Sequence, residues 1–453
     1  MPNRSLSVGG FVLLVVMAWG LPALAEDLGQ MRVQRMDGSW ITGQVEDVGD
    51  SYRIKMGTGI TVTLPKNQVK ALVPIEQPGT GESAEADQAE ATGPISDKDI
   101  EALLEGINVD TTAVVEGSTP IPDQLPTNEE SVQEMMRLAG ADKKLETPHF
   151  VMVYTAKDEE ARRLARRLEA VWRWNIKYFR LLDVPVTVPE YKLEIYFFGT
   201  YDEFETHSVN TSGRPTGGAL GYFQPVSNRS HFFEMVTYPP AEARLKLAED
   251  KSLPLAVRQR HRNIVRRWAE GMNMEVVQHE VGHHIHFNLG LFPYQTMVDA
   301  ALERESDDPF PRWLVEGTTM MFEVPPTTAG ASLGVINHGR LDEFRRRHAN
   351  RPFTPEFLKR FVVDNGVWFS GYYYPEGWAL VYYLRKNFKD GFAKYMQMMT
   401  EREPGDEVNF NKWEKEFEDC FGKIDKEWVE KFYAYMYSLP LKKSLLAPEL
   451  DEP

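Results

Sequence analysis

The chain contains a single cysteine, Cys420, among its 453 residues. One cysteine cannot close an intramolecular disulfide, and it provides no cysteine set for a zinc finger, no Cys-x-x-Cys redox pair and no N-terminal lipid anchor. Because Cys420 lies in an amphipathic, helix-like stretch (KWEKEFEDCFGKI), we expect a packed apolar side chain rather than a nucleophile. The fold must therefore be held together by its hydrophobic core.

Positive charge is also scarce, with 51 Lys and Arg against 67 Asp and Glu and a net charge of −16. Such a chain has no bulk electrostatic attraction for nucleic acid or for an anionic membrane surface, so we expect no nucleic-acid partner. The composition, 42% apolar and 26% charged, is nevertheless typical of a globular protein. The length predicts two or three domains.

Long apolar runs are missing apart from one near the start. Residues 1–25 combine Arg4, an apolar run at residues 10–20 and an Ala23-Leu24-Ala25 cleavage pattern, which predicts a secretory signal peptide. The alternative is an uncleaved membrane anchor, but the run is shorter than the roughly 18 residues of a spanning helix. We therefore expect an exported protein, periplasmic or secreted, with no membrane span after cleavage.

Residues 26–76 predict a small all-β domain. Apolar residues alternate with polar ones in five short runs, which are separated by turn signals such as Asp37-Gly38 and Gly49-Asp50. This pattern is typical of an SH3-like or Sm-like barrel. The sequence does not identify a partner for the barrel.

The remaining chain divides by composition. Residues 77–97 lack apolar periodicity and predict a flexible acidic linker, and residues 98–146, with weak helical patches at 99–107 and 129–138, predict a connector or a pro-segment. Residues 147–440 predict the main domain and residues 441–453 a C-terminal tail. Strand and helix patterns mix in the main domain, which indicates an α+β fold.

The most informative motif is His279-Glu280-Val281-Gly282-His283, an HExxH sequence. On a helix, positions i and i+4 project from the same face, so His279 and His283 can bind one metal ion. Glu280 lies about 100° round the helix and can reach a water at the metal, as a general base must. The flanking pattern of Val276, Val277, Val281 and Ile285 predicts a helix with a buried apolar stripe.

Glu316 is the candidate third ligand, 33 residues beyond His283, in the segment PRWLVEG. Two imidazoles and one carboxylate are a known ligand set for catalytic zinc. Spacing alone leaves an alternative open, because a glutamate near a helix N-terminus is also favoured by the helix dipole.

These motifs resemble the bacterial peptidase-MA-like families of gluzincin type. The resemblance rests on HEVGHH, then PRWLVEGTTMMFE, then YYYPEGWALVYYLRKNF, and it extends over roughly residues 147–438. It implies a zincin-like fold with one zinc ion per chain, bound by His279, His283 and Glu316, and with Glu280 as the base. Members often carry an acidic residue four positions after the ligand Glu, where this chain has Met320. Support for a ligand histidine could instead come from Glu323.

Tyr374 is the candidate donor to the oxyanion that forms during hydrolysis, on the family-like spacing to Trp378. Tyr372 and Tyr373 are its neighbours, and an aromatic packing cluster with Trp368 is the alternative interpretation. We expect His284 and His286 to be structural residues, or residues that support a ligand, rather than ligands themselves.

We therefore expect an exported zinc metallopeptidase that hydrolyses a peptide or protein substrate. The run at residues 231–237 is a candidate edge strand onto which an extended peptide could add by β-augmentation. The alternative is a non-catalytic envelope or surface protein that keeps a peptidase-like domain for binding, with the N-terminal barrel as the working module.

Overall fold

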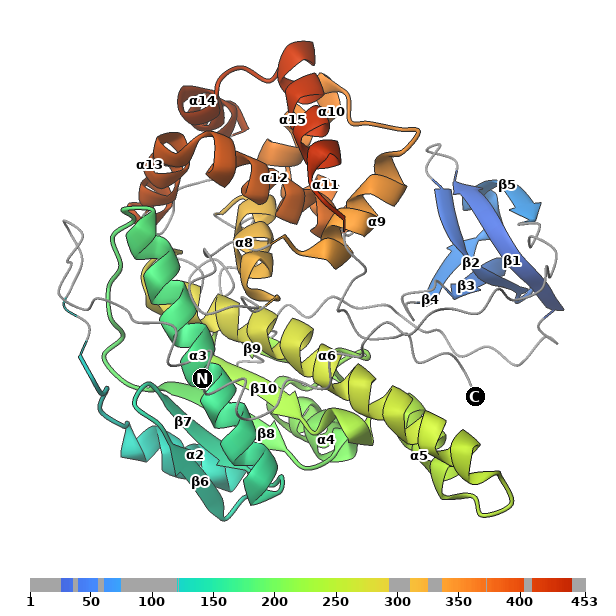
Figure 1. Ribbon diagram of the computed structural model, residues 1–453, viewed down its shortest axis with the longest axis vertical. Coiled ribbons are helices and arrows are strands. Elements are labelled where there is room, and N and C mark those ends of the chain that lie inside the picture. The colour runs from blue at the N-terminus through green and yellow to red at the C-terminus, as the bar shows by residue number, and fades with distance from the viewer. Residues whose placement is uncertain are drawn as a thin grey trace, which may run out of the picture. The chain divides into compact units, whose positions relative to one another are not determined.

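The computed structural model describes nine stretches of the chain, which together form an α+β fold (Figure 1). The expected signal peptide, acidic linker and helical patch at residues 99–107 lie outside them. Two compact units are present, one within residues 14–92 and the other containing residues 93–453. The described stretches are 26–35, 40–55, 61–74, residue 120 with 122–292, 310–324, 336–371, 373–402 and 410–441.

The N-terminal unit is an antiparallel sheet of the five strands that the sequence predicts, in the order β4-β3-β2-β1-β5. Its small core contains Val33, Val45, Ile54 and Leu64. Among the described strands no ladder joins β4 to β5, so closure into an SH3-like or Sm-like barrel stays a prediction. The strands are β1 (Glu26–Arg35), β2 (Trp40–Asp47), β3 (Ser51–Lys55), β4 (Thr61–Pro65) and β5 (Val69–Pro74).

The second unit is built on a mixed sheet of order β6-β7-β8-β10-β9. The three central strands are parallel, and both edge strands are antiparallel to their neighbours. Every residue of β7 is buried, as expected for a strand covered on both faces. The strands are β6 (Lys143–Glu146), β7 (Phe150–Tyr154), β8 (Leu193–Phe198), β9 (Tyr222–Gln224) and β10 (Arg229–Phe233).

Alternation along these strands separates two apolar layers. Phe150, Met152 and Ile195 belong to the larger core, with α3 (Asp158–Leu181) and the C-terminal half of α6 (Leu255–Asn288). Val151, Val153 and Phe198 belong to a second core with α2 (Glu129–Ala139) and α4 (Tyr201–Ser212). The sheet is therefore the middle layer of this part of the protein (Figure 1).

The prediction of an edge strand at residues 231–237 is wrong both in the extent of the strand and in its position in the sheet. The strand there, β10, ends at Phe233, and Met235–Thr237 form a 3-10 turn. The strand β10 pairs with β8 on one side and β9 on the other, so β9 is the edge. The sequence shows no signal for β9, because this strand has only three residues and directly follows a glycine-rich stretch at residues 213–221.

The C-terminal part is helical and packs over α6 (Figure 1). None of the described helices is long and apolar enough to cross a bilayer. Cys420 is half-buried and packs against the main core. The other helices of this unit are α5 (Pro239–Glu249), α8 (Arg312–Thr319), α9 (His338–His348), α10 (Pro355–Val363), α11 (Asn365–Gly371), α12 (Tyr374–Asn387), α13 (Lys389–Thr400), α14 (Phe410–Phe421) and α15 (Lys426–Ser438), with the 3-10 turn η3 (Met320–Phe322).

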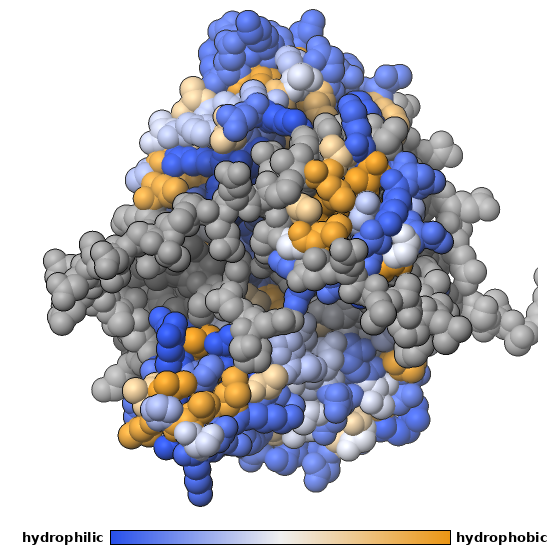
Figure 2. Space-filling model, turned by 90° about the vertical axis from the view of Figure 1, so that its right-hand side faces the viewer, coloured by the Kyte–Doolittle hydropathy of each residue, from blue (hydrophilic) through white to orange (hydrophobic). Residues whose placement is uncertain are grey.

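The surface is mainly hydrophilic on the face seen in Figure 2, where apolar side chains gather in separate patches. Among the described residues, the most exposed large apolar side chains are Leu255 (57%), Leu181 (55%) and Phe410 (49%). They lie on three different helices, α6, α3 and α14, so the described surface has no single dominant apolar helix face.

Glycines allow helices α6, α8 and α12 to approach closely. A Cβ on Gly317 of α8 would lie 2.5 Å from the carbonyl oxygen of Gly377 and 2.6 Å from Val381 Cγ2, both on α12. A Cβ on Gly282 of α6 would lie 2.8 Å from Cγ2 of Thr319 on α8. Any larger residue at these positions would therefore push the helices apart.

We predict that Gly317→Ala destabilises the protein by about 1–3 kcal/mol, because overpacking forces backbone or side chains to move. Urea unfolding followed by circular dichroism measures the change. An unchanged unfolding midpoint would show that α8 and α12 tolerate a wider separation.

Two histidines of the sheet layer, His207 on α4 and His231 on β10, are buried among aromatic rings. Burial disfavours the charged imidazolium, which lowers the pKa of His207 to about 4 and that of His231 well below its usual value. Their folded-state pKa values are below the unfolded value of about 6.5, so the unfolded chain binds more protons as the pH falls below that value.

Stability should therefore fall as the pH drops from about 6.5 to about 4, by up to about 3 kcal/mol for His207 alone. His207→Phe, which keeps an aromatic ring but cannot be protonated, should flatten this dependence. Unfolding free energies measured at several pH values test the prediction, and an equal slope in the variant would contradict it.

Candidate metal centre

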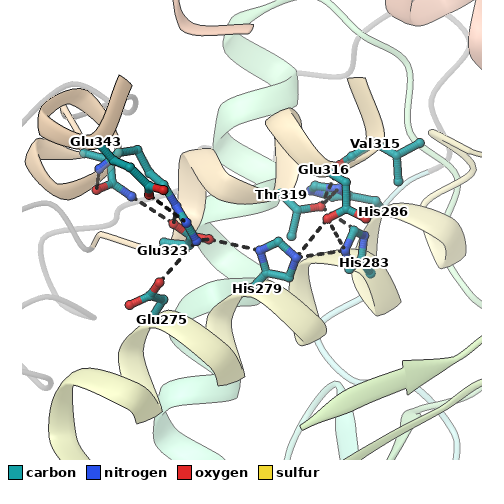
Figure 3. Close-up of polar contacts among 11 residues, drawn as sticks. Glu275, His279, His283, His286, Val315, Glu316, Thr319, Glu323 and Glu343 are labelled. Carbon is teal, nitrogen blue, oxygen red and sulfur yellow. Dashed lines mark hydrogen bonds and ion pairs between the residues drawn. The ribbon is translucent and has the colours of Figure 1, made fainter. Parts of the chain in front are cut away.

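The helix α6 carries His279 and His283 on one face, as the HExxH spacing predicts. Both residues are buried, with exposures of 9% and 8%. Val277, Val281 and Ile285 are buried in the main core, so they fix the rotation of the helix. This rotation directs the two imidazoles towards α8 (Figure 3).

Glu316 meets the two histidines from α8. Its Oε2 atom lies 3.1 Å from His279 Nε2 and 3.3 Å from His283 Nε2. The two Nε2 atoms are 3.1 Å apart. One ligand atom from each residue lies within 4.8 Å of the others, so the group could hold a metal ion. The structure thus brings together all three residues expected to bind metal.

The Nδ1 atoms of His279 and His283, on the side of each ring away from Glu316, have hydrogen-bond partners that leave the Nε2 atoms free to bind a cation. His279 Nδ1 lies 3.1 Å from Glu323 Oε1, and this carboxylate oxygen accepts a hydrogen bond from the Nδ1–H. His283 Nδ1 lies 3.2 Å from Thr319 Oγ1, and the Thr319 hydroxyl donates to Val315 O at 2.9 Å. Both Nε2 atoms are then left with lone pairs facing each other and a carboxylate. Three electron-pair donors at this separation need a positive charge between them.

The charges of the centre depend on each other. Burial opposes ionisation of Glu316, but His283 and His279 outweigh it and hold the pKa of this carboxyl well below its usual value. Burial also opposes protonation of His279, yet hydrogen bonds with Glu316 and Glu323 raise its pKa to about 10. The site therefore favours a cation, which can be either a proton or a metal ion.

A polar network supports Glu323 on the side away from the ligands. Arg340 donates to Glu323 through Nη2 at 2.8 Å and Nε at 3.0 Å, and Asn337 Nδ2 donates at 2.9 Å. Arg340 also donates to Glu275 Oε1 at 3.1 Å. The sequence already points to Glu323 as support for a ligand histidine. Thr319 lies within the segment PRWLVEGTTMMFE, but nothing in the pattern assigns it a role, and Asn337, Arg340 and Glu275 lie outside the motifs.

Glu280 lies beside the centre on α6 and is half-buried. Its Oε2 accepts a hydrogen bond from the backbone N–H of Phe223, on the edge strand β9, at 3.0 Å. Burial raises the pKa of Glu280, partly offset by His279 and His283. The contact fixes one carboxylate oxygen and brings β9 next to the candidate base.

Tyr374 is the first residue of α12 and faces the centre. Its ring packs edge-to-face on His279, with centroids 6.1 Å apart, and also on Trp368, at 5.3 Å. The charge of Glu316, and then burial, raise the pKa of Tyr374, which therefore stays protonated at neutral pH. Tyr373 instead packs against Phe353 and Phe357, and Tyr372 lies outside the described residues. Tyr374 thus takes part both in the aromatic cluster and in the site.

The neighbouring histidines make other contacts. His284 Nδ1 lies 3.0 Å from Ser230 Oγ. His286 Nε2 donates to Asn175 Oδ1 at 2.7 Å, while its Nδ1 lies 3.4 Å from Thr319 Oγ1, the oxygen that also faces His283 (Figure 3). Neither belongs to the group that could hold a metal ion. These contacts agree with the structural roles expected from the sequence.

The fold and the site define an α+β protein with a candidate metal centre of two histidines and a glutamate. Residues 273–406 match the model of a family described as "Protein of unknown function (DUF1570)". The match covers 134 of the 453 residues and includes His279, Glu280, His283, Glu316 and Tyr374. A comparison with curated proteins gave no match. The family description names no activity.

We predict that Thr319→Val lowers metal affinity about 10- to 100-fold, because it removes the oxygen that orients His283. The matched control is Thr318→Val, since the buried Thr318 hydroxyl has no hydrogen-bond partner among the described residues. Competition titration with a chromophoric chelator measures both variants. Equal affinities in the two variants would contradict the role of Thr319.

Proposed function

We propose that the protein is an exported zinc-dependent peptidase. The observation that carries the proposal is the meeting of two Nε2 lone pairs and the Glu316 carboxylate. Two neutral imidazoles and one carboxylate match the ligands of catalytic zinc sites and leave room for a fourth position. The glutamate of HExxH beside them is the residue that hydrolytic zinc sites use as a base.

We further propose that residues 147–440, together with the edge strand β6 that directly precedes them, form a zincin-like domain. A mixed sheet with an antiparallel edge strand supports this assignment, together with the long helix α6 that carries the motif and packs on the sheet. The third ligand comes from a separate helix, α8, as the resemblance to gluzincins implies. Export through the signal peptide at residues 1–25, to the periplasm or outside the cell, belongs to the same proposal.

In this mechanism Glu280 transfers protons. A bound zinc ion would polarise the scissile carbonyl and acidify water at the site. The carboxylate of Glu280 takes a proton from that water as the water oxygen bonds to the carbonyl carbon, and it passes the proton to the amine nitrogen as the carbon–nitrogen bond breaks. The Phe223 N–H occupies Oε2, which leaves Oε1 for the water.

Tyr374 and β9 have supporting roles. The protonated Tyr374 hydroxyl donates a hydrogen bond to the carbonyl oxygen as negative charge develops on it. The edge strand β9, rather than β10, aligns an extended peptide by main-chain hydrogen bonds, because β9 lies at the sheet edge and contacts Glu280.

We predict that Glu280→Gln retains the metal ion but loses about 10²- to 10⁴-fold in kcat, because the amide cannot accept the proton. The matched control is Glu270→Gln, which changes a half-buried glutamate on the same helix. A peptide-library screen by mass spectrometry, with metal content measured in parallel, tests both variants.

Unchanged turnover in Glu280→Gln would refute its assignment as the base. If the metal-loaded wild-type protein hydrolyses no peptide, the proposed activity fails. The non-catalytic binding protein would then be the better interpretation.

A further inference from the structure

Arg340 lies at the centre of a buried charge cluster behind the metal ligands. It is the third residue of α9, and its side chain is only 16% exposed. Its guanidinium contacts carboxylates from three segments: Glu323 at the end of η3, Glu275 on α6, and Glu343 on α9 at 4.0 Å. Arg340 therefore joins α9 to both segments that shape the metal centre.

The contact between Arg340 and Glu323 determines which lone pairs of the Glu323 carboxylate remain free. Arg340 Nε and Asn337 Nδ2 both donate to Oε2, while Arg340 Nη2 donates to Oε1. This forked contact fixes the plane of the carboxylate. One lone pair of Oε1 remains for the Nδ1–H of His279. The plane of Glu323 thus sets the orientation of His279, and with it the direction of the Nε2 lone pair.

The same guanidinium also faces Tyr374. Its Cζ atom lies 5.6 Å from the centroid of the Tyr374 ring, within cation–π distance. Tyr374 also packs edge-to-face with His279 and with Trp368 on α11. The side chain of Arg340 therefore contacts both Glu323, which supports the candidate ligand His279, and Tyr374, the candidate oxyanion donor.

We propose that Arg340 is a positioning residue that fixes His279, through Glu323, and Tyr374, through its ring, in one arrangement. The part that concerns His279 requires only metal binding. The part that concerns Tyr374 in catalysis rests on the proposed function. Neither part requires Arg340 to touch substrate.

Arg345 is a matched control on the same helix. It donates to the backbone oxygens of Met436 and Leu439, and its Cζ lies 5.6 Å from the ring of Tyr437. Arg345→Met also removes a hydrogen-bonding and cation–π arginine from α9, but its hydrogen bonds go to backbone oxygens near the C-terminal helix instead of to carboxylates at the metal centre. Any general loss of stability caused by removing an arginine from α9 should affect both variants.

The first test measures zinc affinity and the visible spectrum of the cobalt-substituted protein, which reports ligand geometry. Arg340→Met should weaken zinc binding about 10- to 100-fold and alter the cobalt spectrum, while Arg345→Met should change neither. Arg340→Lys keeps the positive charge but cannot make the forked pair of hydrogen bonds to Glu323. Its cobalt spectrum should therefore be altered as in Arg340→Met. Wild-type affinity and spectrum in Arg340→Met or Arg340→Lys would overturn the proposal.

The second test is a double-mutant cycle on unfolding stability. Arg340→Met should destabilise the metal-free protein less in a Tyr374→Leu background than in the wild-type chain, and it should be additive with Tyr437→Leu. Additivity with Tyr374→Leu would overturn the tyrosine part. These readouts do not depend on turnover, so a wild-type protein that cleaves no peptide would defeat the proposed function without deciding this inference.

Discussion

The rest of the site depends on one electrostatic constraint: three electron-pair donors must be held where they repel one another. Two imidazole nitrogens and the carboxylate of Glu316 lie about 3 Å apart. The fold holds them by close helix packing, in which Gly282 lies against Thr319 and Gly317 against Gly377. A cation, either a proton or a metal ion, relieves the repulsion, so the same packing that brings the donors together favours a positive charge at this place.

A short segment of chain contributes most of the centre. Residues 316–323 contain the candidate ligand Glu316, the Thr319 hydroxyl that accepts from His283 Nδ1–H, and the Glu323 carboxylate that accepts from His279 Nδ1–H. One helical turn and the 3-10 turn after it therefore set both histidine tautomers. The helix α9 then holds this segment through Arg340.

The parts of the site that the sequence predicts are those determined by local spacing. His279 and His283 are one helical turn apart, and Glu316 follows in a segment that resembles the corresponding motif of the gluzincin-type families. Thr319 and Arg340 could not be predicted, because their contacts join residues far apart in the chain and involve common residue types. The edge strand was misassigned because β9 is too short to show alternation. The α+β class and the five N-terminal strands were predicted correctly, since their patterns extend over whole elements.

Anomalous diffraction at the zinc absorption edge, on crystals of the protein purified without chelators, tests the central claim most directly. We predict one zinc ion bound to the Nε2 atoms of His279 and His283 and to a carboxylate oxygen of Glu316, at about 2.0–2.2 Å. Zinc bound to other residues, or no ion between these three when zinc is supplied in excess, would contradict the account.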